Sequence, residues 1–266
     1  MNMVRGQNKE AKYLYCIIKC GEERSFNGVE AIGGRGDKIH AVVFEDLACV
    51  VSDSPDMKYD STRANMTGHE KVIEQVMKEF TVLPIRFGTV TRRDSDVPVE
   101  DIRHKLLESR YQEFQSLHQE MDNRVELGLK VLWWDEKAIF EEIVVENREI
   151  RKARDSIKGL SPEATHFDRM HLGERVKEAL GRKRDKEAKM LLSRIRPIAD
   201  RIQENRAIMD RMVLNAAFLV SKDREKECDQ VVKRLDEGLG ERMAFKYIGP
   251  TPPFNFCEIV VSWEEE

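Results

Sequence analysis

Val82-Leu83-Pro84-Ile85-Arg86-Phe87-Gly88-Thr89, reading VLPIRFGT, is the stretch of sequence that decides the fold. Its apolar residues predict a strand over 82–90, and Arg86 places a cation inside that strand. Such a cation fits either an ion pair that ties a helix to the sheet edge or a contact in a partner-binding surface. For Phe87 followed by Gly88, the pattern favours a core aromatic ring and then a bulge or turn.

A second unusual stretch lies near the C-terminus, where residues 247–256 read YIGPTPPFNF. Pro250, Pro252 and Pro253 stiffen the connection between the last two expected strands. Phe254 and Phe256 fit either of two roles. They pack into the core, or they form a rigid apolar knob for docking, because an aromatic ring on a preorganised turn loses little entropy on binding.

Length and composition restrict the class of protein. The 266 residues suffice for two domains, and 35% charged residues with a mean hydropathy of -0.55 predict helices that project into solvent. A net charge of -4 gives no overall attraction to nucleic acid or acidic membranes. The N-terminus shows no apolar targeting stretch, so we expect a soluble, cytoplasmic protein without membrane contact. The five cysteines lie mostly in apolar runs, which predicts reduced core thiols.

The N-terminal pattern predicts an α+β domain over residues 1–122. Its helices would cover one face of a mostly antiparallel sheet, close to a modified ferredoxin-like arrangement. The expected strands and helices, in order, are strands 13–20, 39–44 and 47–52, helix 68–80, strand 82–90 and helix 99–121.

A second domain, residues 123–266, is predicted to begin with a regularly alternating strand at 125–134. Residues 136–211 then predict a long helical hairpin with a narrow apolar stripe, and Pro197 should kink or break its helix. The stripe consists of Leu191, Ile195, Ile198, Ile202 and Met209. Strand 215–221, helix 225–239 and strands 243–248 and 256–263 are expected to follow.

No residue pattern indicates catalysis, a metal site or a cofactor. The glycine-rich residues 33–37, GGRGD, fit neither the P-loop nor the dinucleotide fingerprint, which favours a flexible loop. The basic residues 182–186 lack interleaved aromatic residues and have acidic neighbours, which favours a solvated helix tip over a nucleic-acid site. We therefore expect an interaction protein and not an enzyme.

Four segments together resemble the signature segments of the gas vesicle protein F/L family. They are Tyr13-Leu14-Tyr15, residues 82–89, the run KVLWWD at 130–135 and residues 247–256. The resemblance implies an accessory protein that assists assembly of the gas vesicle shell by binding its small hydrophobic structural subunit or other accessory proteins. It also implies an N-terminal ferredoxin-like domain and a C-terminal α/β domain. Phe254 stands where the family commonly has Tyr, and Cys16 where it commonly has Gly.

The partner-binding hypothesis rests on both unusual stretches. Its candidate residues are Arg86, Phe87, Pro250, Pro252, Pro253, Phe254 and Phe256. The alternative is a nucleic-acid-binding protein that uses a ferredoxin-like sheet and the basic helix tip. A small-molecule enzyme stays open as a third hypothesis, because catalytic sites assemble in three dimensions.

Overall fold

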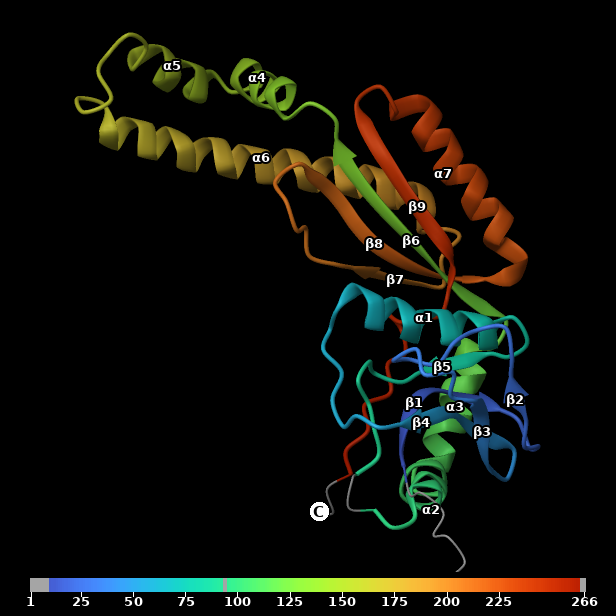
Figure 1. Ribbon diagram of the computed structural model, residues 1–266. Helices are drawn as coiled ribbons and strands as arrows, with labels where there is room; N and C mark the ends of the chain where they lie inside the picture. Colours follow the sequence, from blue (N-terminus) through green and yellow to red (C-terminus); the bar gives the residue numbers. More distant parts are fainter. Residues whose placement is uncertain (1–9, 93–94, 264–266) are drawn as a thin grey trace, which may run out of the picture. The chain divides into compact units, whose positions relative to one another are not determined.

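The computed structural model describes residues 10–92 and 95–263, which form two compact units (Figure 1). The first unit comprises the described residues up to Glu126 and those from Pro250 onward, and the second is Leu127–Gly249. The sequence placed the last segment in a domain of residues 123–266, but it packs with the first unit. The reason is a pair of backbone hydrogen bonds between Ile259 and the chain around Arg86.

A five-stranded sheet with the order β2-β3-β4-β1-β5 forms the centre of the first unit. Its strands are β1 (Ala11–Lys19), β2 (Ser25–Phe26), β3 (Ile39–Phe44), β4 (Leu47–Ser54) and β5 (Val82–Pro84). All neighbouring strands pair antiparallel. The predicted hairpin at Glu45 and Asp46 is confirmed, with Phe44 opposite Leu47 and Glu45 at a φ of 51°. The ferredoxin-like description of this unit stays a prediction.

Helix α1 (Arg63–Met77) packs on this sheet through His69, Val72, Ile73 and Val76. Thr62 caps its N-terminus by accepting a hydrogen bond from the amide of Asn65. The helix begins five residues earlier than the sequence pattern placed it.

The region predicted as one helix over 99–121 is helical, but it is not one continuous α-helix. Three segments occupy this region: α2 (Pro98–Glu100), the π-helical η1 (Asp101–Glu108) and α3 (Tyr111–Met121). The amide of Ser109 reaches back five residues to the carbonyl oxygen of His104. The hydroxyl of Ser109 donates to the carbonyl oxygen of Lys105 at 2.6 Å. Such local bonds compete with regular helical pairing and widen the turn.

The strand predicted over 82–90 is shorter than expected and ends at Pro84. The amide of Ile85 still bonds to Tyr15, whereas the amide of Arg86 donates to the carbonyl oxygen of Ile259. The strand predicted over 256–263 is also wrong, because in the described part of the chain it is reduced to a single parallel bridge between Ile85 and Ile259.

The second unit contains a four-stranded sheet with the order β7-β8-β6-β9, and both sheets of the protein are antiparallel. Its elements are β6 (Arg124–Trp133), α4 (Glu136–Glu146), α5 (Arg148–Ser156), α6 (His166–Ile195), β7 (Arg201–Glu204), β8 (Met212–Ser221), η2 (Lys222–Arg224), α7 (Glu225–Leu239) and β9 (Met243–Thr251). The predicted alternation in β6 is confirmed: the odd-numbered side chains from Val125 to Trp133 are all buried.

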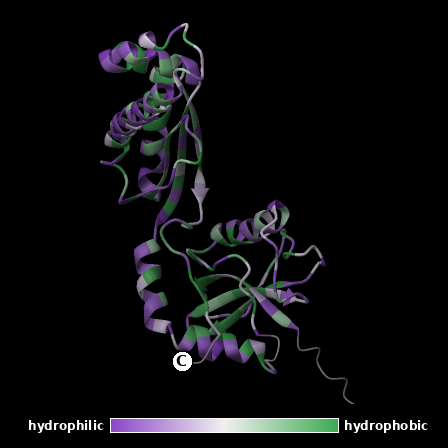
Figure 2. Ribbon diagram, turned by 90° about the vertical axis from the view of Figure 1, so that its left-hand side faces the viewer, coloured by the Kyte–Doolittle hydropathy of each residue, from purple (hydrophilic) through white to green (hydrophobic). Residues whose placement is uncertain are grey.

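Helices α4 and α5 run back along α6 and form the helical hairpin (Figure 1). Polar and apolar residues alternate along these helices (Figure 2). Among the described residues, no helix is apolar over a length that would cross a bilayer.

The hairpin is shorter than predicted, because α6 ends at Ile195, two residues before Pro197. Residues 201–204, predicted as helix, form β7 and pair with β8. Of the predicted stripe, Leu191, Ile195 and Ile198 are buried, whereas Met209 is 42% exposed. All five cysteines are free thiols, and four of them are buried, as the apolar runs predicted.

Candidate functional site

Within the first unit, the VLPIRFGT stretch is hydrogen-bonded to the segment that follows the proline turn. The amide of Arg86 donates to the carbonyl oxygen of Ile259 at 2.9 Å, and the amide of Ile259 donates to that of Pro84 at 2.7 Å. Because β5 is the last strand of its sheet, these bonds add the C-terminal segment to an otherwise open edge.

Arg86 forms an ion pair with Glu258 of the same C-terminal segment. Its Nη2 and Nε donate to one carboxylate oxygen at 2.9 and 3.2 Å. The side chains are 55% and 46% exposed, so this pair lies at the surface. The sequence left two roles open for Arg86, an ion pair or a partner contact. The ion pair is present, but its partner lies in the C-terminal segment and not on a helix. Ion pairs with this exposure contribute about 0–1 kcal/mol.

Phe87 is half-buried and packs against the core of the first unit, as its sequence context favoured. Its ring lies edge-on to the imidazole of His69, with 5.7 Å between centroids. Gly88 follows at a φ of 81°, and its amide donates to the Tyr13 hydroxyl at 2.9 Å. The turn predicted after Phe87 is thus confirmed, and Tyr13 holds it.

His69 links this turn to helix α1. Its Nδ1 lies 3.0 Å from the Tyr13 hydroxyl, and the ring also bonds to the backbone of Ile85. Burial lowers the pKa of His69 to about 4, so the imidazole is neutral at pH 7. Since the Tyr13 oxygen already accepts from Gly88, we assign its proton to the bond with His69 Nδ1.

Hydrogen bonds within the proline turn stabilise its backbone. Pro252 and Pro253 are buried, whereas Pro250 is exposed. The carbonyl oxygen of Pro253 accepts from the amides of Phe256 and Cys257, at 3.0 and 2.8 Å. This local pattern closes a tight turn whose shape the prolines restrict.

Glu126 anchors the turn from the start of β6. Its carboxylate, on a residue only 5% exposed, accepts from the amide of Asn255 at 2.8 Å and from Asn255 Nδ2 at 2.6 Å. Burial raises the pKa of Glu126, and the two hydrogen bonds from Asn255 oppose that change. Removing the carboxylate would leave buried polar groups of the turn without this partner.

Phe254 and Phe256 are both half-buried. Phe254 packs against the same core as Phe87, so its ring supports the fold and is not a freely projecting knob. A partner-binding role for the seven candidate residues stays a prediction. Of those residues, Arg86 and Pro250 are exposed enough to meet a partner with most of their side chains.

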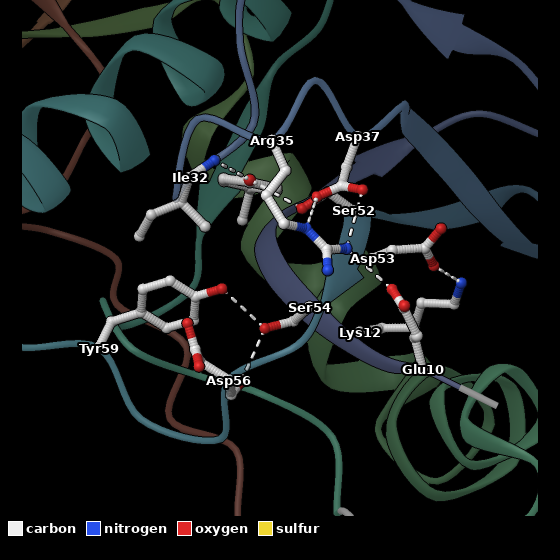
Figure 3. A network of polar contacts seen from close by, with 11 residues as sticks. Glu10, Lys12, Ile32, Arg35, Asp37, Ser52, Asp53, Ser54, Asp56 and Tyr59 are labelled. Carbon is white, nitrogen blue, oxygen red and sulfur yellow. Dashed lines mark hydrogen bonds and ion pairs between the residues drawn. The ribbon is translucent and has the colours of Figure 1, made fainter. Parts of the chain in front are cut away.

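A second polar cluster surrounds the GGRGD loop (Figure 3). Carboxylate oxygens of Glu10, Asp37 and Asp53 lie within 4.8 Å of one another. Arg35 pairs with Glu10 at 2.8 Å and with Asp37 at 2.9 Å, and Lys12 pairs with Asp53. These two cations supply the charge that a metal ion would bring, so the donor set fits internal ion pairing.

The same loop borders an open pocket of about 580 Å³ against the exposed face of α1. Its lining is mostly glycine, alanine and backbone, and Glu30 and Lys71 are its ionisable residues.

Sequence reasoning missed four residues that organise the site: Tyr13, His69, Glu126 and Glu258. Tyr13 lay in a recognised motif, but nothing local indicated its contact with Gly88, 75 residues away. A weak indication in the sequence marked Glu126 as structurally important, since this carboxylate lies between two residues of a buried strand face. Its partner Asn255 lies 129 residues away, beyond any pattern in a single sequence.

Comparison with known proteins gives concordant results. The family model described as gas vesicle synthesis protein GvpL/GvpF matches residues 11–258. Gas vesicle protein F of Nostoc sp. is 27% identical over 225 residues, covering 83% of this chain and 88% of the relative. The crystal structure of the gas vesicle protein GvpF from Anabaena sp. PCC7120 superposes with a TM-score of 0.79 at 26% identity, covering 94% of this chain and 99% of that one. The GvpF crystal structure from Microcystis aeruginosa, at 24% identity and a TM-score of 0.75 over 93% and 99% of the two chains, shares the fold.

Proposed function

The chain belongs to the gas vesicle synthesis protein GvpL/GvpF family, and from that premise we propose that it assists assembly of the gas vesicle shell. It acts by binding the small hydrophobic structural subunit of the shell, alone or with other accessory proteins. It works through protein contacts and not as an enzyme.

One observation carries the proposal: the large apolar side chains left exposed are concentrated in one unit. Of twelve such side chains among the described residues, eight lie within Leu127–Gly249. The eight are Trp134, Val145, Leu160, Phe167, Met170, Ile208, Met209 and Ile248. Exposed apolar side chains offer contacts to a protein partner, and a very hydrophobic subunit needs such contacts to stay unaggregated before it polymerises.

Co-expression with the structural subunit tests the proposal. We expect the subunit to stay in the soluble fraction and to be captured by the tagged full chain. The control is a tagged protein of similar size without relation to gas vesicles. If the soluble amount and the captured amount of subunit match that control, the adaptor function is wrong.

The alternative, a nucleic-acid-binding protein, is tested with the same full chain. It requires salt-dependent retention on immobilised nucleic acid, because phosphate contacts release counterions. The full chain should pass through such a column at about 150 mM salt, close to physiological ionic strength.

A further inference from the structure

The end of the helical hairpin that lies farthest along α5 and α6 from the sheet carries an unusual group of exposed side chains. Phe167 is 71% exposed and Met170, one helical turn later, is 49% exposed. Leu160, in the connection between α5 and α6, is 53% exposed. We call these three residues the hairpin tip.

Internal hydrogen bonds hold the backbone beside the tip in one arrangement. The hydroxyl of Thr165, a residue only 2% exposed, donates to the carbonyl oxygen of Ser161 at 2.9 Å. Arg169 Nε then donates to the same hydroxyl oxygen at 2.8 Å. Because the turn is built before any partner arrives, Phe167 loses little conformational freedom on binding.

The opposite end of the hairpin is fixed to the sheet of the second unit. Trp133 Nε1 donates to Glu187 at 2.6 Å, and Arg242 pairs with Glu187 at 2.9 Å and also with Glu142. Lys183 pairs with Glu142 at 2.9 Å. We call these five residues the base clamp. It ties α4 and α6 to β6 and to the start of β9, so the hairpin presents its tip from a supported base.

The hairpin differs in charge from the rest of the chain. Residues 147–196 contain 15 Lys and Arg against 8 Asp and Glu, a net charge of +7, although the whole chain carries -4. Arg151, Lys152 and Lys158 lie on or directly after α5, are exposed, and form no ion pair within the part of the chain that the structure describes. A partner of the tip therefore meets an apolar group within a positive field.

We infer that the hairpin tip is the docking surface for an apolar segment of a protein partner that is bordered by acidic side chains. The inference rests on the proposed function and describes the contact face of the shell subunit by its chemistry. Charge complementarity steers the acidic border to α5, and the exposed phenyl and thioether groups bury apolar surface on contact. Nucleic acid fits less well, because acidic residues are interspersed along α6 and Phe167 is the one aromatic ring of the tip.

Capture of the co-expressed shell subunit by the tagged full chain tests the tip directly. The tip variant is Phe167→Ser with Met170→Ser, and the charge variant is Arg151→Glu with Lys152→Glu. We expect each variant to capture about tenfold less subunit than wild type. Capture by wild type should fall as salt is raised from about 50 to about 500 mM, and the charge variant should lose most of that dependence.

Matched controls separate docking from folding. Met66→Ser removes a side chain of α1 that is 42% exposed, and Lys226→Glu with Lys246→Glu reverses two exposed cations of the second unit. Both controls should capture as much subunit as wild type. Thermal melts of all variants should match wild type, because every substituted side chain is exposed.

Each outcome decides the matter. If wild type captures the subunit and the tip and charge variants capture equally well, the tip is not the docking surface and the proposed function still stands. If wild type itself captures none, the proposed function fails and the tip assignment fails with it. If a single-stranded DNA of about 30 nucleotides binds wild type and displaces the subunit, and the charge variant alone loses both, the site is a nucleic-acid site and the inference is overturned.

Discussion

Replacing Glu142 with Gln should weaken the base clamp and remove part of the acid sensitivity of the second unit. Hydrogen bonds from Arg242, followed by those from Lys183, lower the pKa of Glu142 to about 2. A carboxyl whose pKa is lowered on folding stabilises the protein above its unfolded pKa of about 4.5, and that stability is lost as pH falls toward 2.

The size of the effect follows from the pKa and the exposure. A change from about 4.5 to about 2 corresponds to about 3 kcal/mol if it acts in full. The side chain of Glu142 is 33% exposed, so solvent screening reduces the contribution to about 1–2 kcal/mol. Part of the clamp survives in the variant, because Arg242 keeps Glu187 and Lys183 keeps Glu146.

Urea unfolding followed by fluorescence of Trp133 measures this contribution. Trp134→Phe and Trp263→Phe in the background leave one reporter, whose indole is buried in the clamp. Wild type should lose about 1–2 kcal/mol between pH 6 and pH 3 beyond what the variant loses. Glu141→Gln is the matched control, since Glu141 is exposed and has no ion-pair partner among the described residues. Equal pH dependence in wild type and the Glu142 variant would refute the reasoning.

Three further measurements address other parts of the molecule. Arg86→Ala should lower the free energy of unfolding by about 0–1 kcal/mol, because its ion pair with Glu258 is exposed. Phe254→Ala should lower it by about 2 kcal/mol through lost packing of a half-buried ring. Thermal melts distinguish the two variants, and an unchanged melt for Phe254→Ala would contradict the packing of Phe254 against the core. His118→Leu should stabilise the protein by about 1 kcal/mol at pH 7, because neither ring nitrogen of this buried residue has a hydrogen-bond partner among the described residues. Burial lowers the pKa of His118 to about 4, so urea unfolding of the variant should also show less loss of stability between pH 6.5 and 4 than wild type. Hydrogen exchange should be faster in α5 and the connection to α6 than in β6, and equally strong protection of both would contradict the marginal burial of the hairpin.

Local patterns predicted the elements whose causes are local. The alternation of β6 places one set of side chains in the core, and the tight turn at Glu45 and Asp46 sets the register of β3 and β4. Both predictions are confirmed because each depends on neighbouring residues and on one buried face.

The predictions of secondary structure were wrong where residues far away in the sequence determine the hydrogen bonding. Residues 256–263 have strand-like composition, but their hydrogen bonds are divided among partners around Pro84, Arg86 and beyond, so no regular ladder forms. Residues 201–204 have the charge pattern of the preceding helix and still form a strand, because pairing with β8 becomes available once Pro197 has ended α6. The apolar period continues across Pro197 in the sequence, but α6 ends before it.

The candidate site shows the same division between what holds the fold and what is free to bind. The motif residues make their contacts inside the first unit: Gly88 is hydrogen-bonded to Tyr13, Asn255 is hydrogen-bonded to Glu126, and Phe254 packs against the core. Substitutions there must therefore cost stability whether or not they also cost binding. Phe167 is 71% exposed, and its ring lies edge-on to the imidazole of its exposed neighbour His166, so its replacement should leave the melting temperature unchanged. A variant that loses capture of the shell subunit without losing stability is thus expected at the hairpin tip and not at the motifs. If instead the stable, binding-deficient variants cluster at Arg86 and Pro250, the exposed members of the motifs, then those motifs form the contact face and the apolar hairpin tip has another use.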